Sequence, residues 1–480
     1  MKMEDEYAEF LERKSQRHTE SGFSPTFLPD SLFDFQRALV EWAVQKGRAA
    51  VFADCGLGKT LIQLVWAQNI VEHTNKRVLV LTPLAVGEQT LQEGARFGVE
   101  CVRSRDGIFP PGAKIVITNY EKLHLFEPKD FAGAVCDESS ILKHFSGATQ
   151  QAVTRFISKM DYRSLYTATA APNDYVELGT SSQALGYLGH SDMLTRFFRQ
   201  TDGKSHQARD ESNARKAQTN KHFQRLSFRV SQQIGQWRLK GHAESHFWDW
   251  VCSWARACRM PSDLGFSDSR FSLPSLTETP HIIDPKTPGE GLLFSVPAVG
   301  LKAEREERRR TLNERCELAA SLVSHDRPAV IWCHLNDEGD LLAKLIPDSR
   351  QVRGSTSDED KENIYNNFAG GSLRVLIIKP KIGAWGLNWQ HCADVVQFAS
   401  HSYEQYYQSI RRCWRFGQDH PVKVDIIATT GEAHVVDNMN RKKITAGRMF
   451  DRLVAHMDQG RHITEDNFTV PMEVPSWLEH

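Results

Sequence analysis

The amino-acid sequence predicts an α/β fold: two doubly wound lobes of parallel sheet, with a helical, basic insertion between them. Short runs of apolar, β-branched residues alternate with helical patterns in residues 31–195, and the same alternation returns in residues 301–480. Continuous apolar runs of this kind are typical of parallel strands that are buried on both faces. With 480 residues, the chain is long enough for about three folding units.

The expected strands follow in order along the chain. In the first lobe they lie at Ala49–Phe52, Arg77–Leu81, Lys114–Thr118, Ala132–Cys136 and Ser164–Thr167. In the second lobe they lie at Ala329–Cys333, Gln351–Arg353, Arg374–Ile378, Val395–Phe398 and Val422–Ile427. Residues 1–30 form a polar leader for which a helix is expected, and residues 196–300 form the insertion, which ends in a Pro-rich connector.

Composition excludes several classes of protein. Apolar residues make up 40% and charged residues 25%, as in ordinary globular proteins. The 59 basic and 60 acidic residues leave a net charge of −1, so any surface that binds nucleic acid must be local. Nine cysteines, an odd number with no C-x-x-C pair, favour reduced thiols in the cytoplasm over a disulfide framework or a zinc ribbon.

Two features argue against secretion and against a membrane partner. The amino terminus, MKMEDEYAEFLERK, is acidic and amphipathic, whereas a signal peptide is basic and then apolar. The most apolar stretch, Val78 to Val86, is about half as long as a bilayer span requires. We therefore expect a cytoplasmic protein without a membrane span.

A phosphate-binding loop is predicted directly after the first strand. The sequence Ala53-Asp-Cys-Gly-Leu-Gly-Lys-Thr60 stands between that strand and a helical pattern. Gly56 and Gly58 would let backbone N–H groups face a phosphate, Lys59 would neutralise its oxygens, and Thr60 would bind Mg²⁺. Ala53 replaces the first glycine of the strict pattern, and the alternative is a chance Gly-Lys turn.

A pair of acidic residues follows the fourth expected strand. Asp137 and Glu138 stand at the carboxyl end of Ala132–Cys136, where ligands gather in open parallel sheets. We predict that Asp137 binds Mg²⁺ and that Glu138 polarises the attacking water. On its own, an Asp-Glu pair is more often part of a solvated loop.

Together these residues resemble the superfamily 2 helicases, in their Swi/Snf-like branch. The phosphate loop, Asp137-Glu-Ser-Ser-Ile-Leu-Lys and Thr167-Ala-Thr-Ala-Ala-Pro-Asn are similar to motifs I, II and III. The resemblance implies two RecA-like lobes that use ATP and Mg²⁺. It also implies that Gln36 reads adenine and that Thr82 and Thr118, in motifs Ia and Ib, contact a nucleic-acid backbone. Thr82-Pro83 is also a common strand end.

The second lobe carries motifs of the same family. Lys381-Ile-Gly-Ala-Trp-Gly386-Leu-Asn388 resembles motif V, which implies that Gly386 approaches the nucleotide and Asn388 the DNA. Gln408-Ser-Ile-Arg-Arg-Cys-Trp-Arg-Phe-Gly-Gln418 resembles motif VI. On a helix, Arg412 and Arg415 would project from one face toward a γ-phosphate, where guanidinium groups neutralise charge. The alternative is a basic, solvated helix, which we consider an option for Arg411.

Arg353 stands in a loop that resembles a DNA-backbone contact of this family, and other positions depart from the family pattern. Ser140 replaces a motif II histidine, Ala170 a motif III proline, and Trp389 a small aliphatic residue after motif V. These changes affect the expected coupling between hydrolysis and DNA engagement. The D-E-S-S form of motif II resembles phage and bacterial members, which implies a bacterial or phage-infected host cell.

The insertion is basic and aromatic. Between Arg196 and Lys240 there are eleven basic and three acidic residues, a net charge of +8. Such a segment suits a surface that follows phosphates, with Arg215, Lys216 and Lys221 as candidate contacts. A solvated helical hairpin with core aromatics is the equal alternative. Phe247, Val251, Trp254 and Cys258 recur at helical spacing and are expected to pack inward. Zinc at His242 and His246 is disfavoured by the cysteine spacing.

The leading hypothesis is a DNA-dependent ATPase, a translocase that tracks double-stranded DNA. One rival is a strand-separating or fork-remodelling helicase, for which no wedge or pin element is recognisable. A rival of another class is a nucleotide-switched DNA clamp or assembly subunit with little turnover. Turnover stimulated by nucleic acid would separate the clamp from the two motors.

Overall fold

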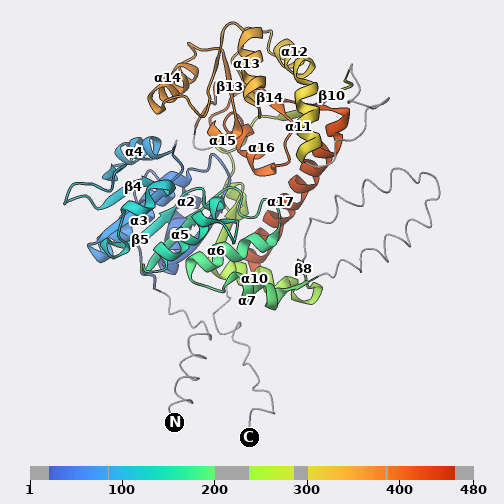
Figure 1. Ribbon diagram of the computed structural model, residues 1–480. Helices are drawn as coiled ribbons and strands as arrows, with labels where there is room; N and C mark the ends of the chain where they lie inside the picture. Colours follow the sequence, from blue (N-terminus) through green and yellow to red (C-terminus); the bar gives the residue numbers. More distant parts are fainter. Residues whose placement is uncertain (1–20, 85, 201–236, 286–300, 384–386, 460–480) are drawn as a thin grey trace, which may run out of the picture.

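The structure is a computed structural model that describes residues 21–84, 86–200, 237–285, 301–383 and 387–459 (Figure 1). Among these residues, no helix is long and apolar enough to cross a membrane. Two parallel sheets organise the described chain. The first lobe lies at the lower left of Figure 1 and the second lobe above it.

The first lobe is built on a seven-stranded sheet with the order β3-β4-β2-β5-β6-β1-β9, in which every pair of neighbours is parallel. Its strands are β1 (Arg48–Ala53), β2 (Arg77–Thr82), β3 (Cys101–Arg103), β4 (Ile115–Asn119), β5 (Phe131–Cys136), β6 (Tyr162–Tyr166) and β9 (Ala255–Cys258).

Helices cover both faces of this sheet. They are α2 (Asp34–Lys46), α3 (Lys59–Thr74), α4 (Gly87–Arg96), α5 (Ala148–Ile157), α6 (Leu178–Leu185), α7 (His190–Phe197) and α10 (Glu244–Trp254). Successive side chains of β1 enter opposite cores: Ala50 and Phe52 join one apolar cluster, and Ala49 and Val51 the other. A strand buried on both faces has no polar side to mark alternation, which explains its continuous apolar sequence.

The second lobe has a six-stranded parallel sheet with the order β10-β15-β14-β11-β13-β12. Its strands are β10 (Leu276–Ile283), β11 (Ala329–Trp332), β12 (Ser349–Gln351), β13 (Val375–Ile378), β14 (Asp394–Phe398) and β15 (Val422–Thr429). Its helices are α11 (Leu301–Arg310), α12 (Leu312–Leu322), α13 (Asn336–Leu345), α14 (Asp358–Ala369), α15 (Pro380–Gly383) and α16 (Tyr403–Ile410). The predicted pair of doubly wound α/β lobes is confirmed.

Each of the ten predicted strands has a counterpart, although the one predicted at Gln351–Arg353 shares only Gln351 with β12, and further strands were missed. β3 is short and only half-buried, so its sequence carries little hydrophobic signal. β10 falls in the segment expected to be a Pro-rich connector. It includes Pro280, which the sheet tolerates because β10 is an edge strand that pairs only with β15.

The described parts of the predicted insertion are built into the two lobes, most of them into the first. β7 (Phe198–Gln200) and β8 (Trp237–Leu239) form an antiparallel pair, α10 packs in the first-lobe core, and β9 extends the first sheet. The helix expected through Cys258 ends at Trp254, so that expectation was wrong in length. All four residues of the stripe are buried as predicted. The first three lie on α10, and Cys258 lies on strand β9, which pairs with β1.

The remainder of the predicted insertion, residues 201–236 and 286–300, lies outside the described residues, as do residues 1–20 of the leader. The described end of the leader, residues 21–30, is not helical, contrary to the expectation. It packs on the first lobe, where the ring of Phe23 stacks on His73 with centroids 3.8 Å apart.

The long helix α17 (Ala433–Gln459) joins the two lobes. It begins beside α11 and β15 in the second lobe and runs down to α10 and β9 of the first, as the red helix in Figure 1 shows. Met449, Phe450, Leu453 and Met457 belong to a first-lobe core cluster. The predicted second domain, residues 301–480, therefore contributes its last described helix to the other lobe.

We expect Leu453→Ala to destabilise the first lobe by about 2–5 kcal/mol, because it removes a side chain that is only 1% exposed in a packed core. Urea unfolding followed by tryptophan fluorescence measures the loss. Ile444→Ala is the matched control on the same helix, since Ile444 is 56% exposed and its truncation should change stability by less than ~0.5 kcal/mol. Equal effects of the two substitutions would contradict the docking of α17.

Candidate active site

The loop between β1 and α3 has the conformation expected of a phosphate-binding loop. Gly56 and Gly58 have left-handed φ values of 92° and 72°, and Gly58 caps the amino terminus of α3. A Cβ atom on Gly58 would lie 2.4 Å from Nε2 of Gln36, and one on Gly56 would lie 2.9 Å from the backbone nitrogen of Phe416. Both backbone angle and space therefore require glycine. Phe416 belongs to the second lobe, so the loop lies at the boundary between the lobes.

Side chains predicted to bind the nucleotide surround this loop. The Lys59 ammonium donates to the carbonyls of Ala53 and Asp54 at 3.0 and 3.2 Å, which holds it over the loop. Gln36 is buried; its Nε2 donates to the Leu57 carbonyl at 2.9 Å and its Oε1 accepts from the Phe33 N–H at 3.0 Å. The carboxamide thus joins α2 to the loop. Adenine recognition by Gln36 stays a prediction.

The acidic pair lies at the carboxyl end of β5, and both side chains are buried. The Nε2 amide of Gln63, one turn along α3 from Lys59, donates to Oδ1 of Asp137 at 2.5 Å. Glu138 has a φ of 47°, a left-handed conformation that costs energy for a residue with a side chain. Backbone strain of this kind is typical of functional sites.

Burial raises the pKa of Asp137 to about 7, with a further contribution from the neighbouring charge of Glu138. The Gln63 hydrogen bond and the Lys59 charge act in the opposite direction. Two buried carboxylates beside a lysine form a site that lacks sufficient positive charge. A divalent cation would supply that charge.

Arg411 of the second lobe forms a buried ion pair with the loop. Its Nη2 lies 2.7 Å from Oδ2 of Asp54 and donates to the Cys55 carbonyl at 2.6 Å. The hydroxyl of Tyr407 donates to Oδ1 of the same carboxylate. Burial acts to lower the pKa of Arg411, but Asp54, Tyr407 and Cys55 together outweigh burial, and the pKa is raised. The alternative of a solvated Arg411 is therefore wrong, since the side chain is buried.

Gln408 connects the two lobes at the acidic pair. Its Nε2 donates to Oε2 of Glu138 at 3.5 Å, and its Oε1 accepts from Nη2 of Arg412 at 2.9 Å. Arg412 is therefore one side chain removed from Glu138. Asp54, Gln63, Gln408 and Arg411 were absent from the predicted site. Gln408 opens motif VI and Asp54 stands inside motif I, so their positions in those motifs were available signals.

Arg412 and Arg415 were expected on a helix, and this prediction is wrong. α16 ends at Ile410, and both arginines follow in hydrogen-bonded turns. Arg412 also donates to the Leu387 carbonyl at 2.9 Å, and Nη1 of Arg415 donates to Oδ1 of Asn388, so motifs V and VI contact each other. Burial, and then the charge of Arg412, lower the pKa of Arg415 to about 10. Gly417 has a φ of 87° and ends the turn, while Gln418 fixes it by donating to Cys392 and Cys413 carbonyls.

The predicted nucleic-acid contacts differ in exposure. Thr82 ends β2, and Thr118 is the last residue but one of the adjacent strand β4. Both side chains are buried, and Thr82 donates to the Thr118 carbonyl at 3.4 Å. Arg353 is exposed and pairs with Asp340. The roles of these residues stay predictions. Gly386, Arg215, Lys216 and Lys221 lie outside the described residues.

The described residues fit a nucleotide with its Mg²⁺. Lys59, Arg412 and Arg415 supply cationic donors, and the buried carboxylates of Asp137 and Glu138 provide the oxygen ligands that Mg²⁺ prefers. Nε of Arg415 is buried and has no hydrogen-bond partner among the described residues. An unpartnered buried guanidinium N–H is costly, and an anion would satisfy it.

A comparison with protein families bears on this geometry. Residues 313–417 match the model of the helicase conserved C-terminal domain. The match begins in α12 and ends at Gly417, after the two arginines. It supports a helicase of superfamily 1 or 2, and with the first lobe it gives two RecA-like lobes. No curated protein matches the chain.

We expect Asp137→Asn to raise the thermal unfolding midpoint at pH 8 in the absence of nucleotide and divalent cations. The folded pKa of about 7 exceeds the unfolded value of ~3.9, so ionised Asp137 costs stability. That cost begins as pH rises through ~4, is complete above about 7, and is at most about 4 kcal/mol. Asparagine keeps the oxygen that accepts from Gln63.

The advantage of Asp137→Asn should shrink as pH falls and vanish near pH 4, which differential scanning calorimetry at several pH values can follow. Asp161→Asn is the control, because Asp161 is an exposed carboxylate on the same lobe. A variant that is less stable than the wild type at pH 8 would show that the Asp137 carboxylate is needed for the fold.

Proposed function

We propose that this protein is a DNA-dependent ATPase that hydrolyses ATP between its two lobes while it tracks double-stranded DNA. The family match supports a helicase-like nucleic-acid motor. The observation that carries the proposal is the contact of motif VI with both the phosphate loop and Glu138, through Arg411 and Gln408. A site assembled from both lobes lets turnover change how the lobes are held together.

The first lobe would bind the nucleotide and position water. Lys59 and the N–H groups of the glycine loop would bind phosphate, and Thr60 with Asp137 would hold Mg²⁺. Glu138 would orient the attacking water and accept its proton. Its hydrogen bond from Gln408 supports this assignment, because it makes the base sensitive to the position of the second lobe.

The second lobe would neutralise the charge that develops during hydrolysis. Arg412 and Arg415 are the candidate residues, since planar guanidinium groups bind phosphoryl oxygens in a bidentate manner. Arg412 is held in place by three hydrogen bonds to Gln408 and Leu387. Preorganised donors of this kind cost no reorganisation during the reaction.

The nucleic acid would follow the faces that carry motifs Ia, Ib and V. We propose backbone contacts at Thr82, Thr118, Arg353 and Asn388, and further phosphate contacts at Arg215, Lys216 and Lys221. Asn388 accepts a hydrogen bond from Arg415. A DNA contact at Asn388 would therefore be one hydrogen bond away from an arginine of the nucleotide site.

We further propose that this protein is a member of the Swi/Snf-like branch and acts in the cytoplasm of bacteria or phage-infected cells. The end of motif VI and the D-E-S-S form of motif II support this assignment. Two of the positions that depart from the family pattern are buried. Trp389 packs against Trp332 and Phe368, and Ser140 Oγ has no hydrogen-bond partner among the described residues. No protein partner is proposed.

We expect ATP hydrolysis to be stimulated most by double-stranded DNA in an assay that compares no nucleic acid, single-stranded, duplex and forked DNA, and RNA. Lys59→Ala should weaken nucleotide binding and turnover, whereas Glu138→Gln should retain binding and lose turnover. Arg412→Ala should reduce turnover ~10³-fold or more with little change in ADP affinity.

Two exposed substitutions serve as controls for these variants. Lys76→Ala and Arg327→Ala remove exposed cations from the first and second lobes that belong to none of the motifs, and should keep wild-type rates. Wild-type turnover by Lys59→Ala would disprove the site. Nucleotide binding without any stimulation by nucleic acid would instead identify a switched clamp.

We also expect the protein to displace a triplex-forming third strand from duplex DNA using ATP, yet to leave a blunt or tailed duplex unseparated. Movement along a backbone removes an obstacle, but strand separation also needs a rigid element that divides the duplex. Gel assays with a labelled third strand and a labelled tailed duplex make the comparison, with Glu138→Gln as the inactive control. Efficient unwinding of the tailed duplex without third-strand displacement would favour the helicase alternative.

A further inference from the structure

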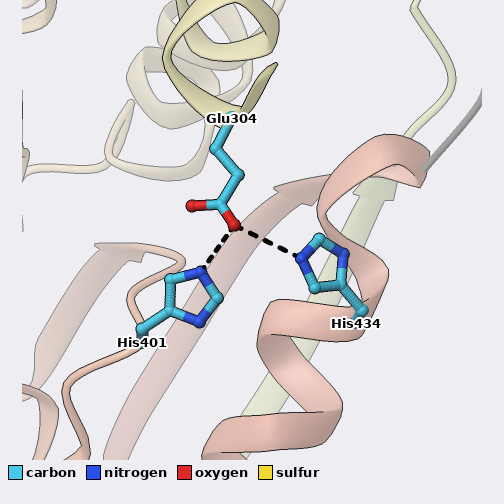
Figure 2. Close-up of side chains that lie close together, drawn as sticks. All are labelled: Glu304, His401 and His434. Atoms are coloured by element: carbon cyan, nitrogen blue, oxygen red, sulfur yellow. Dashed lines mark hydrogen bonds and ion pairs between the residues drawn. The ribbon is translucent and has the colours of Figure 1, made fainter. Parts of the chain in front are cut away.

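A second cluster of polar side chains lies away from the nucleotide site, where α17 leaves the second lobe. Figure 2 shows its three members: Glu304 on α11, His401 in the loop between β14 and α16, and His434 in the first turn of α17. Both imidazoles point at the same carboxylate oxygen. Nε2 of His401 lies 2.9 Å from Oε1 of Glu304, and Nε2 of His434 lies 3.5 Å from it.

These distances match the spacing of ligands around a small divalent ion. The three ligand atoms all lie within 4.8 Å of one another. Ligands at the usual zinc distances of 2.0–2.2 Å in a tetrahedron are separated by about 3.3 Å, between the two distances observed here. An ion needs only small side-chain shifts to bind at this position.

The chemistry of the cluster selects among metals. Two imidazoles and one carboxylate suit borderline divalent ions such as Zn²⁺ or Co²⁺. Mg²⁺ and Ca²⁺ prefer oxygen ligands alone, and no sulfur ligand is present for a soft ion such as Cu⁺. Glu304 is 8% exposed while His401 and His434 are 37% and 31% exposed, so the site is anchored on a buried carboxylate and open to solvent on one side.

Two neighbouring basic side chains make hydrogen bonds outside the cluster. Arg308 pairs with Glu432 at 2.7 Å and donates to the Ala399 carbonyl at 3.0 Å. Lys442 donates to the His401 carbonyl at 2.9 Å, which fixes the loop but leaves the imidazole unopposed. Asn438 lies next to Nδ1 of His401, at 3.5 Å, and orients the ring.

We propose that Glu304, His401 and His434 form a binding site for Zn²⁺ or a similar divalent transition-metal ion, with solvent as the fourth ligand. The ion fastens α11, the His401 loop and the start of α17 to one another. The His401 loop continues directly into α16, which carries Tyr407 and Gln408. Metal binding thus stabilises the first turn of α17, which joins the lobes, and the start of α16, which leads to motif VI. The proposal does not depend on ATP hydrolysis.

The direct test measures metal bound by the full-length chain. Protein freed of metal by chelator dialysis is equilibrated with Zn²⁺ in the presence of excess Mg²⁺, which occupies hard oxygen sites. We expect one equivalent of zinc in the wild type. His401→Gln and His434→Gln should each weaken zinc binding by more than ~100-fold. Loss of a residue that only hydrogen-bonds to a metal ligand weakens metal binding by ~10–100-fold, and loss of a ligand should cost more.

His456→Gln is the matched control on α17, since His456 pairs with Asp249 alone at 3.0 Å and no third ligand is present among the described residues. It should retain the bound equivalent. The Co²⁺-loaded protein should show d–d absorption without a sulfur-to-metal band, which separates this site from binding by the cysteines.

A measurement on the wild type covers the case in which a variant fails to fold. Zn²⁺ should protect His401 and His434, but not exposed histidines such as His242, from diethylpyrocarbonate, as read by peptide mass spectrometry. The proposal is overturned if zinc binds with equal affinity in both histidine variants and the wild type, if Co²⁺ shows sulfur ligation, or if no zinc binds. The cluster would then be a hydrogen-bonded His-Glu-His group.

Discussion

The buried ion pair between Asp54 and Arg411 is the interaction on which the arrangement of the site depends. Charges removed from water are costly unless they are paired and hydrogen-bonded, and here Tyr407 and the Cys55 carbonyl complete the network. Because Arg411 belongs to one lobe and Asp54 to the other, displacing a lobe would break the pair and its hydrogen bonds. The pair therefore specifies the lobe position that brings Gln408 and Arg412 to Glu138.

Sequence patterns predicted most of the sheets and the framework of the site. Parallel strands buried on both faces read as unbroken apolar runs, so each of the ten expected strands has a counterpart. The phosphate loop and the acidic pair were placed correctly at strand ends because the carboxyl ends of parallel strands meet at one edge. That rule is local to each βα unit, so it required no knowledge of how the lobes meet.

The remaining features depend on contacts between distant parts of the chain. Nothing local distinguishes Arg411, which is buried against Asp54, from Arg353, which is exposed. β9 was read as the end of a helix because its apolar residues continue the α10 stripe. The apolar face of α17 predicts that one side of the helix is buried. The helical period does not indicate which of the two lobes that side packs against.

The path of α17 also determines when the first lobe can finish folding during synthesis. Residues 21–258 leave the ribosome early, but the core that holds Trp254 and Ala257 is closed by Leu453 and Met457. At 5–20 residues per second, about 200 further residues take roughly 10–40 s to be made. During this interval the first lobe lacks the helix that covers this core, so the apolar side chains of Trp254 and Ala257 wait for their last partners. Vectorial synthesis thus couples completion of the first lobe to the synthesis of α17, which follows the second lobe in the chain.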